Sequence, residues 1–232
     1  MGRPPHRRNH TMKRAVLALA VLLPNLVLAA EANAPAKSAP KDSKNAPAKA
    51  EPKDSKFLVD YLSQTQKDFL KSIDGLSEAQ WKFKPAPERW SVAEVAEHII
   101  LSEEMFGENI TGKVLKTPAA TAEQKAKTQG LEDKILQGIP DRTNKFKAPE
   151  KLQPASKFAS AKEAAKAFTD RRDANIALAK TTPESELRSH VSGPSPMGDL
   201  DAYQWMLFMA AHAKRHVAQI DEVRADPSFP KK

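Results

Sequence analysis

The chain contains no cysteine among its 232 residues. This absence excludes disulfide frameworks, thiolate zinc sites, thiol nucleophiles and the acylated cysteine of a lipoprotein. Histidine, aspartate, glutamate and water are therefore the ligands that remain for any metal ion.

Two catalytic motifs are missing as well. The H-E-x-x-H motif of zincin proteases needs a glutamate after its first histidine, but Ala213 follows His212 in the pair formed with His216. No serine stands in the G-x-S-x-G setting of a nucleophile elbow. The sequence thus excludes the usual forms of both hydrolase classes.

Net charge is nearly absent from the larger part of the chain. The whole sequence carries +8, but residues 1–56 contain 11 lysines and arginines against 4 acidic residues. Residues 57–232 hold the remaining 26 against 25. A basic face is therefore not expected on the domain, and nucleic acid is not an expected partner.

The N-terminal region has the layout of a secretory signal peptide. Residues 12–34 begin with Lys13 and Arg14, continue with a mainly apolar run over 15–28 and end in small residues. The run is too short and wrongly flanked for a spanning helix, so cleavage is expected shortly after it. An uncleaved membrane anchor is the alternative.

We accordingly assign residues 1–32 to the signal peptide, with Met12 as a candidate true start. Residues 33–56 contain little but small, proline and charged residues, and PKDSK occurs twice in them, which predicts a disordered linker. The mature protein is then expected in the periplasm or secreted, without a stable membrane span.

Four segments have the 3.6-residue periodicity of amphipathic helices, and no segment has a convincing strand pattern. Ser91 with Glu94 has the spacing of a capping box at the start of the second helix. Residues 111–158 are weakly periodic and are predicted to form a lid over one end. These patterns predict an all-α, up-and-down four-helix bundle over residues 57–232, with a long connection between helices two and three. The predicted helices span 57–73, 92–109, 161–180 and about 199–224.

Two histidines of the last helix face the core. At about 100° per residue, His212 and His216 share a face with Trp205 and Ile220. Histidines four residues apart lie one above the other and can share a metal ion. The residues leave two interpretations open: a metal-binding pair, or two core histidines that hydrogen-bond to nearby carbonyl groups.

His98 is the best third ligand. It flanks the apolar stripe of the second helix, beside Ser102 and Met105, where it can face a neighbouring helix across a groove. Three histidines would leave one to three coordination positions free, as in catalytic sites. The other histidines lie in a predicted loop or near the signal region.

Several residues near these histidines have two interpretations each. Glu94 is either a catalytic group or, as we favour, the helix cap. Gln219 either bonds a ligand imidazole or makes an interior polar contact. Arg215 is predicted to be a surface or helix-dipole charge. Trp205, Met209 and Met105 either line a pocket or belong to the ordinary core. No catalytic residue is assigned.

The segments GLSEAQWKFKPAPERWSVAEVAEHIILSE and HAKRHVAQI resemble the DinB superfamily of YfiT-like metal-dependent hydrolases and thiol transferases. The resemblance covers most of residues 57–225. It implies a four-helix bundle with a divalent metal bound by one histidine of the second helix and an H-x-x-x-H pair on the fourth. The matching positions are His98, His212 and His216.

The resemblance implies metal-dependent hydrolysis, or transfer with low-molecular-weight thiols, on a small molecule. The export signal argues against the thiol reactions, because those thiols are cytosolic. The expected mechanism is Lewis-acid activation of a water or thiol. The competing hypothesis is a non-catalytic periplasmic binding or stress-related protein whose histidines hold metal or fill the core.

Zinc is the first metal expected, on availability, and nickel or iron suits imidazole ligands as well. An unidentified small-molecule substrate is the expected partner. Bundles of this kind often pair through exposed helix faces, so a homodimer is a further expectation, although no residue pattern marks its surface.

Overall fold

The computed structural model describes residues 53–231. The predicted signal peptide and most of the predicted linker lie outside these residues. The first helix begins at Ser55, two residues before the predicted start, and Asp54 caps it by accepting a hydrogen bond from the N–H of Phe57 at 2.9 Å. Within the described range, no helix is long and apolar enough to cross a membrane.

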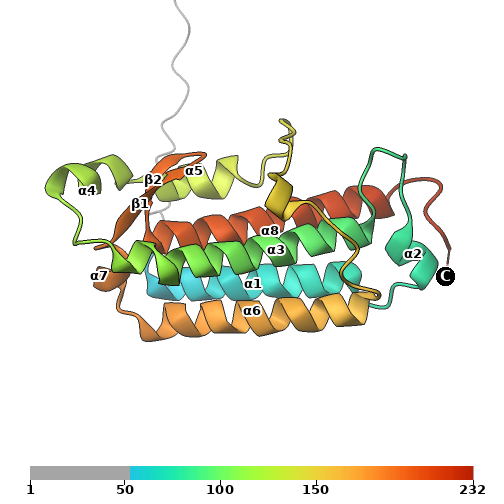
Figure 1. The fold of residues 1–232 in the computed structure, drawn as a ribbon, viewed down its shortest axis with the longest axis horizontal. Coiled ribbons are helices and arrows are strands. Elements are labelled where there is room, and N and C mark those ends of the chain that lie inside the picture. The colour runs from blue at the N-terminus through green and yellow to red at the C-terminus, as the bar shows by residue number, and fades with distance from the viewer. Residues whose placement is uncertain (1–52, 232) are drawn as a thin grey trace, which may run out of the picture. The chain divides into compact units, whose positions relative to one another are not determined.

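Four long helices lie side by side and form the bundle (Figure 1). They are α1 (Ser55–Ile73), α3 (Val92–Gly112), α6 (Ala161–Thr181) and α8 (Ala202–Arg224). Both α1 and α3 pack against α6 and α8, so the order around the bundle is α1, α6, α3, α8. The predicted all-α four-helix bundle with a long connection between its second and third helices is therefore confirmed.

The helices run up, down, down and up. Glu103 of α3 pairs with Arg172 of α6, and four residues later Gly107 lies against Asn175, so these two helices run in the same direction. The connection between them is long enough to return along the whole bundle. The expected up-and-down alternation therefore does not hold between α3 and α6, because the long connection returns the chain to the end of the bundle where α3 begins.

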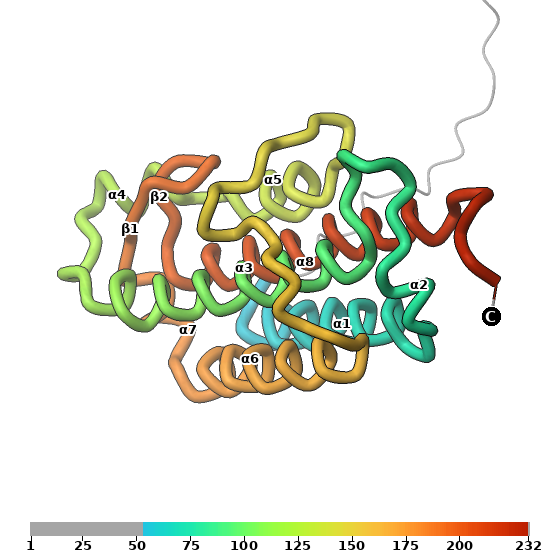
Figure 2. The backbone as a smooth tube through the Cα atoms, turned by 45° about the vertical axis from the view of Figure 1, so that its right-hand side comes forward, coloured from blue at the N-terminus to red at the C-terminus, as the bar shows by residue number. Residues whose placement is uncertain are grey.

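The connection between α3 and α6 contains only short elements. Gly130 has a φ of 73°, in the left-handed region, and separates two of its helices. The amide of Gln204 donates to the carbonyl oxygen of Thr128 at 2.6 Å, and Arg215 bonds to backbone carbonyls within residues 139–144. The connection therefore lies along α8 (Figure 2), and the prediction of a lid over one end is wrong. Its elements are η1 (Val114–Lys116), α4 (Ala122–Thr128), α5 (Leu131–Gly138) and η2 (Glu150–Leu152).

A short antiparallel hairpin precedes α8, where the sequence predicts a loop. β1 (Val191–Ser195) pairs with β2 (Gly198–Asp201). Trp205 donates from Nε1 to the carbonyl oxygen of Ser192 at 2.9 Å, which ties the hairpin to α8. The expectation of no strand is wrong here, because strands this short, interrupted by glycine and proline, have no alternating pattern.

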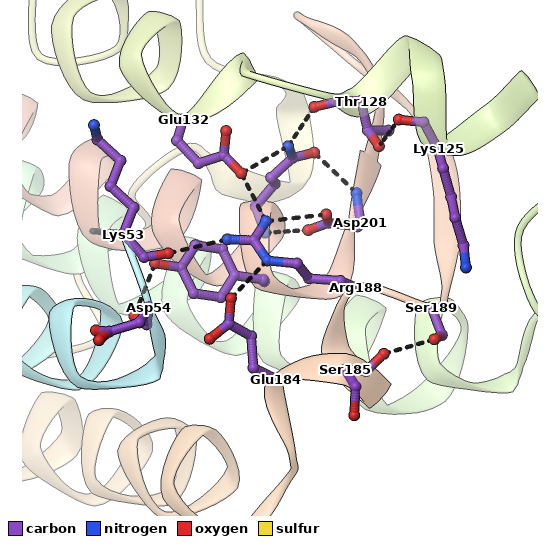
Figure 3. A network of polar contacts seen from close by, with 12 residues as sticks. Lys53, Asp54, Lys125, Thr128, Glu132, Glu184, Ser185, Arg188, Ser189 and Asp201 are labelled. Atoms are coloured by element: carbon purple, nitrogen blue, oxygen red, sulfur yellow. Dashed lines mark hydrogen bonds and ion pairs between the residues drawn. The ribbon is translucent and has the colours of Figure 1, made fainter. Parts of the chain in front are cut away.

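An arginine network holds the start of α1 against the hairpin end of the domain (Figure 3). Arg188, just after α7 (Glu184–Leu187), donates to Glu184 at 2.9 Å, to Glu132 at 2.6 Å and to the carbonyl oxygen of Lys53 at 3.0 Å. Its guanidinium lies 3.9 Å from the centroid of the Tyr203 ring. At the other end, α2 (Glu78–Lys82) begins with a capping box formed by Ser77 and Gln80.

The interior contains two apolar clusters with polar residues between them. In α6, Phe168 belongs to one cluster and Ile176 to the other, and Arg172 lies between the two. In α8, Ala211 and Ala213 belong to different clusters, so His212 stands at a similar boundary. The polar side chains of the core are thus concentrated near the middle of the bundle.

Candidate metal centre

The three predicted histidines come together where α3 packs against α8. One ring nitrogen from each of His98, His212 and His216 lies within 4.8 Å of the other two. The ring centroid of His216 is 4.5 Å from those of His98 and His212, which are themselves 5.2 Å apart. The structure therefore assembles the predicted triad, and metal binding by it stays a prediction.

Hydrogen bonds determine the tautomer of two imidazoles. Nδ1 of His98 lies 2.8 Å from the carbonyl oxygen of Leu152, and because a carbonyl only accepts, this nitrogen carries the proton. Nδ1 of His216 lies 2.8 Å from Oε1 of Gln219, which also accepts from Arg142 at 3.2 Å. Both rings therefore present an unprotonated Nε2, the form that binds metal.

The imidazoles are neutral at physiological pH. Burial lowers the pKa of His216 from 6.5 to about 3, and repulsion from His98 adds to the effect. Burial also lowers the pKa of His212 well below its usual range, with repulsion from His216 next in importance. Burial lowers the pKa of His98, which is 3% exposed, although the Leu152 hydrogen bond opposes the change. Neutral imidazoles have the free lone pairs that metal ions need.

Two of the groups that orient these rings escaped the sequence analysis. The carbonyl of Leu152 and the side chain of Arg142 both belong to the connection, whose weak periodicity gave no sign of a role. A backbone carbonyl has no sequence signal of its own. The prediction that Gln219 bonds a ligand imidazole is confirmed for its contact with His216.

The prediction that Arg215 is a surface charge is wrong. Its side chain is buried, with 8% of the residue exposed, and donates to the backbone carbonyls of Ile139, Asp141 and Asn144. The connection folds over this face of α8, and three carbonyl groups replace the water that the guanidinium would otherwise bind.

The other predicted neighbours are divided between capping and packing. Glu94 accepts a hydrogen bond from the backbone N–H of the N-cap residue at 2.7 Å, which confirms the capping role. Trp205 and Met209 belong to the apolar core, whereas Met105 is 39% exposed. His190 is not part of this group: its Nδ1 lies 2.7 Å from the carbonyl oxygen of Thr117, at the start of the connection.

The donor set fits a divalent transition metal. Zinc binds imidazole nitrogen at about 2.0–2.1 Å, which places tetrahedral ligand atoms roughly 3.4 Å apart. The three nitrogens lie within 4.8 Å of one another, so each pair would have to approach by at most about 1.4 Å to reach that spacing. Aromatic rings flank the group: Trp90 lies 5.1 Å from His98, and Phe106 lies 5.6 Å from His212 between centroids.

Comparison with known proteins identifies the family. The sequence model of the DinB superfamily matches residues 61–220, a span that includes all three histidines. The chain belongs to the DinB superfamily. This DinB-superfamily chain is 28% identical over 156 residues to the uncharacterized protein YuaE of Bacillus subtilis, covering 66% of this chain and 88% of YuaE.

A solved structure agrees with the fold. YfiT from Bacillus subtilis, described as a probable metal-dependent hydrolase with an unusual four-helix bundle topology, matches with a TM-score of 0.50 and 11% identity. The match covers 81% of the present DinB-superfamily chain and 94% of YfiT. At this identity the likeness shows a shared fold.

Proposed function

We propose that this DinB-superfamily protein binds one divalent metal ion through ring nitrogens of His98, His212 and His216, and uses it in hydrolysis or group transfer on a small molecule. The convergence of three neutral imidazoles, two of them in the metal-binding tautomer, carries the proposal. The description of YfiT as a probable metal-dependent hydrolase supports the same class of chemistry.

A bound divalent ion would supply Lewis acidity, polarising a substrate oxygen and lowering the pKa of a water or thiol. The protein supplies orientation and shielding. The hydrogen bonds from His98 and His216 hold two rings in place, and the rings of Trp90 and Phe106 exclude water from the flanks. Three protein ligands would leave coordination positions on the ion to which water or a small molecule could bind.

Zinc is the proposed ion, because three nitrogen donors with open positions suit it and it is commonly available. Nickel and iron are the alternatives that the same donors accept. Metal analysis of protein purified without added metal, followed by competition between these ions, distinguishes them.

The test is the metal content of the full chain beside three single variants. His98→Ala, His212→Ala and His216→Ala are each expected to lose most of about one equivalent of metal, because the remaining two ligands bind weakly. His190→Ala is the matched control, since His190 also bonds a backbone carbonyl but lies apart from the triad. A metal-free parent that cannot be loaded, with folding unchanged in all variants, contradicts the proposal.

A second measurement separates catalysis from simple binding. The cobalt-substituted protein is titrated with small thiols and anions while its visible spectrum is recorded. Spectral changes indicate an exchangeable position and support an enzyme. An unchanged spectrum favours the non-catalytic periplasmic binding or stress-related protein that the sequence also allows.

We also propose that the protein is exported and acts on its small molecule outside the cytoplasm. The support is the basic, apolar and small-residue order of residues 12–34. N-terminal sequencing of the cell-envelope fraction is expected to find a mature chain that starts between about residues 30 and 35. A chain that retains residues 12–28 in the cytoplasm contradicts export. Light scattering of the mature chain tests the expected homodimer.

A further inference from the structure

Two ligand histidines directly follow a buried charged residue. Glu97, 2% exposed, precedes His98, and Arg215, 8% exposed, precedes His216. Neighbours on a helix point about 100° apart, so neither charged side chain shares the direction of its ligand histidine. Both charged side chains bind the α3–α6 connection.

Glu97 holds the end of the connection that carries the Leu152 carbonyl. Its two carboxylate oxygens accept hydrogen bonds from the N–H groups of Ala155 at 2.7 Å and Lys157 at 3.0 Å. Ser156, between them, has a φ of 61°, and this left-handed conformation belongs to the turn held by the carboxylate. Leu152 lies three residues before Ala155, and its carbonyl oxygen accepts the Nδ1 proton of His98.

Arg215 holds the segment that carries Arg142. Its guanidinium donates to the carbonyls of Ile139, Asp141 and Asn144, on both sides of Arg142. Arg142 in turn donates to Gln219 at 3.2 Å, and Gln219 accepts the Nδ1 proton of His216. A bidentate pair at 2.6 and 2.8 Å with Glu222 fixes the direction of Arg142.

We propose that Glu97 and Arg215 are positioning residues for the metal site. They hold residues 139–157 so that the Leu152 carbonyl and the Arg142 side chain orient the imidazoles of His98 and His216. This inference rests on the proposed function, because it concerns the same metal site. Metal affinity then depends on the buried charges of Glu97 and Arg215, which do not touch the ion.

Two measurements on the full chain test the inference. Competition with a chromophoric chelator gives the zinc affinity, and the visible spectrum of the cobalt form reports the geometry of the ligands. Glu97→Gln and Arg215→Gln are each expected to bind zinc about 10- to 100-fold more weakly and to shift the cobalt bands. Glu163→Gln is the matched acidic control, because its carboxylate accepts the Ala159 N–H at 3.0 Å away from the histidines. Arg171→Gln is the basic control, since Arg171 pairs with Glu104 on the outer surface.

Melting curves of the metal-free variants show whether each one folds. If Glu97→Gln or Arg215→Gln unfolds the protein, Arg142→Gln is the deciding variant. The Arg142 side chain lies nearer the surface, and its replacement leaves Glu97 and Arg215 unchanged. Weakened zinc binding in a folded Arg142→Gln protein supports the inference that the segment held by Arg215 orients His216. Unchanged affinity and cobalt bands in the folded variants overturn the inference while leaving the metal site intact. A parent that binds neither ion overturns the proposed function and this inference together.

Discussion

At the scale of single residues, the histidines depend on their hydrogen-bond partners. A neutral imidazole has one donor and one acceptor nitrogen, and the partner of the donor decides which nitrogen faces the metal. His98 uses a backbone carbonyl for this purpose and His216 uses the Gln219 amide. A side-chain partner can be replaced, which makes the second interaction the better one to test.

Replacing Gln219 is expected to change zinc affinity in both directions. Gln219→Leu removes the acceptor of the His216 proton and is expected to weaken binding about tenfold. Gln219→Glu offers a stronger acceptor, with Arg142 to balance its charge, and is expected to tighten binding several-fold. Chelator competition measures both. Equal affinities in all three proteins contradict this role for Gln219.

Zinc affinity is expected to resist acidification. Metal and proton compete for the same lone pairs, so lowering the pKa of the ligands moves the loss of affinity to lower pH. Burial lowers the pKa of all three histidines, to about 3 for His216. Affinity at pH 5.5 should therefore stay within about tenfold of its value at pH 7.5. Three ordinary imidazoles with a pKa of about 6.5 would lose roughly a thousandfold, and such a loss contradicts the expectation.

At the scale of the elements, α1 depends on residues before its first turn. Asp54 caps the helix, and its carbonyl oxygen accepts a hydrogen bond from the Tyr203 hydroxyl at 3.0 Å. The carbonyl of Lys53 accepts from Arg188. The boundary predicted at Phe57 thus removes part of the folded unit, and truncated proteins should begin before Lys53.

Asp54→Ala is expected to lower the free energy of unfolding by about 1 kcal/mol, because the first turn loses its capping acceptor. Urea denaturation of the metal-free protein measures the change. Asp170→Ala is the control, since Asp170 forms an exposed pair with Lys166 within α6 that is worth only a few tenths of a kcal/mol, about the size found for such pairs. A cap substitution no more costly than the control contradicts the expectation.

At the scale of the whole molecule, one buried ion pair connects three helices. Arg172 and Glu103 are 0% and 1% exposed and form two hydrogen bonds of 2.7 Å. Arg172 also donates to the Leu62 carbonyl and the Thr65 hydroxyl of α1. The pair therefore connects α1, α3 and α6 at the boundary between the two apolar clusters.

Arg172→Met is expected to destabilise the protein by about 3–5 kcal/mol, because it leaves the buried Glu103 carboxylate without its counter-charge and with only the Asn175 amide as a hydrogen-bond donor. The double variant with Glu103→Leu is expected to recover much of this loss, since no charge then remains buried. Urea denaturation of the parent, both single variants and the double variant tests the coupling. A double variant as unstable as the sum of its single substitutions contradicts it.

Most of the bundle was predictable because its information is local. Ser91 and Glu94 start α3 through a capping box, and the spacing of Leu58, Leu62 and Phe69 marks one buried face. The β1–β2 hairpin was not predictable, because four- and five-residue strands with glycine and proline have no period to detect. The path of the connection depends on contacts more than 50 residues apart, such as that between His98 and Leu152.

The sequence by itself determined the four helices, the family and which three histidines form the candidate site. Helical periodicity and the H-x-x-x-H spacing depend only on residues that are close in the chain. Only the tertiary structure decided that Arg215 is buried, which ring nitrogen of His98 and His216 carries the proton, and that groups of the connection contact the partners of both rings. The reason is physical. A side chain's protonation and burial depend on groups that the fold brings from distant parts of the chain. The spacing of residues within one helix does not show which distant groups these are.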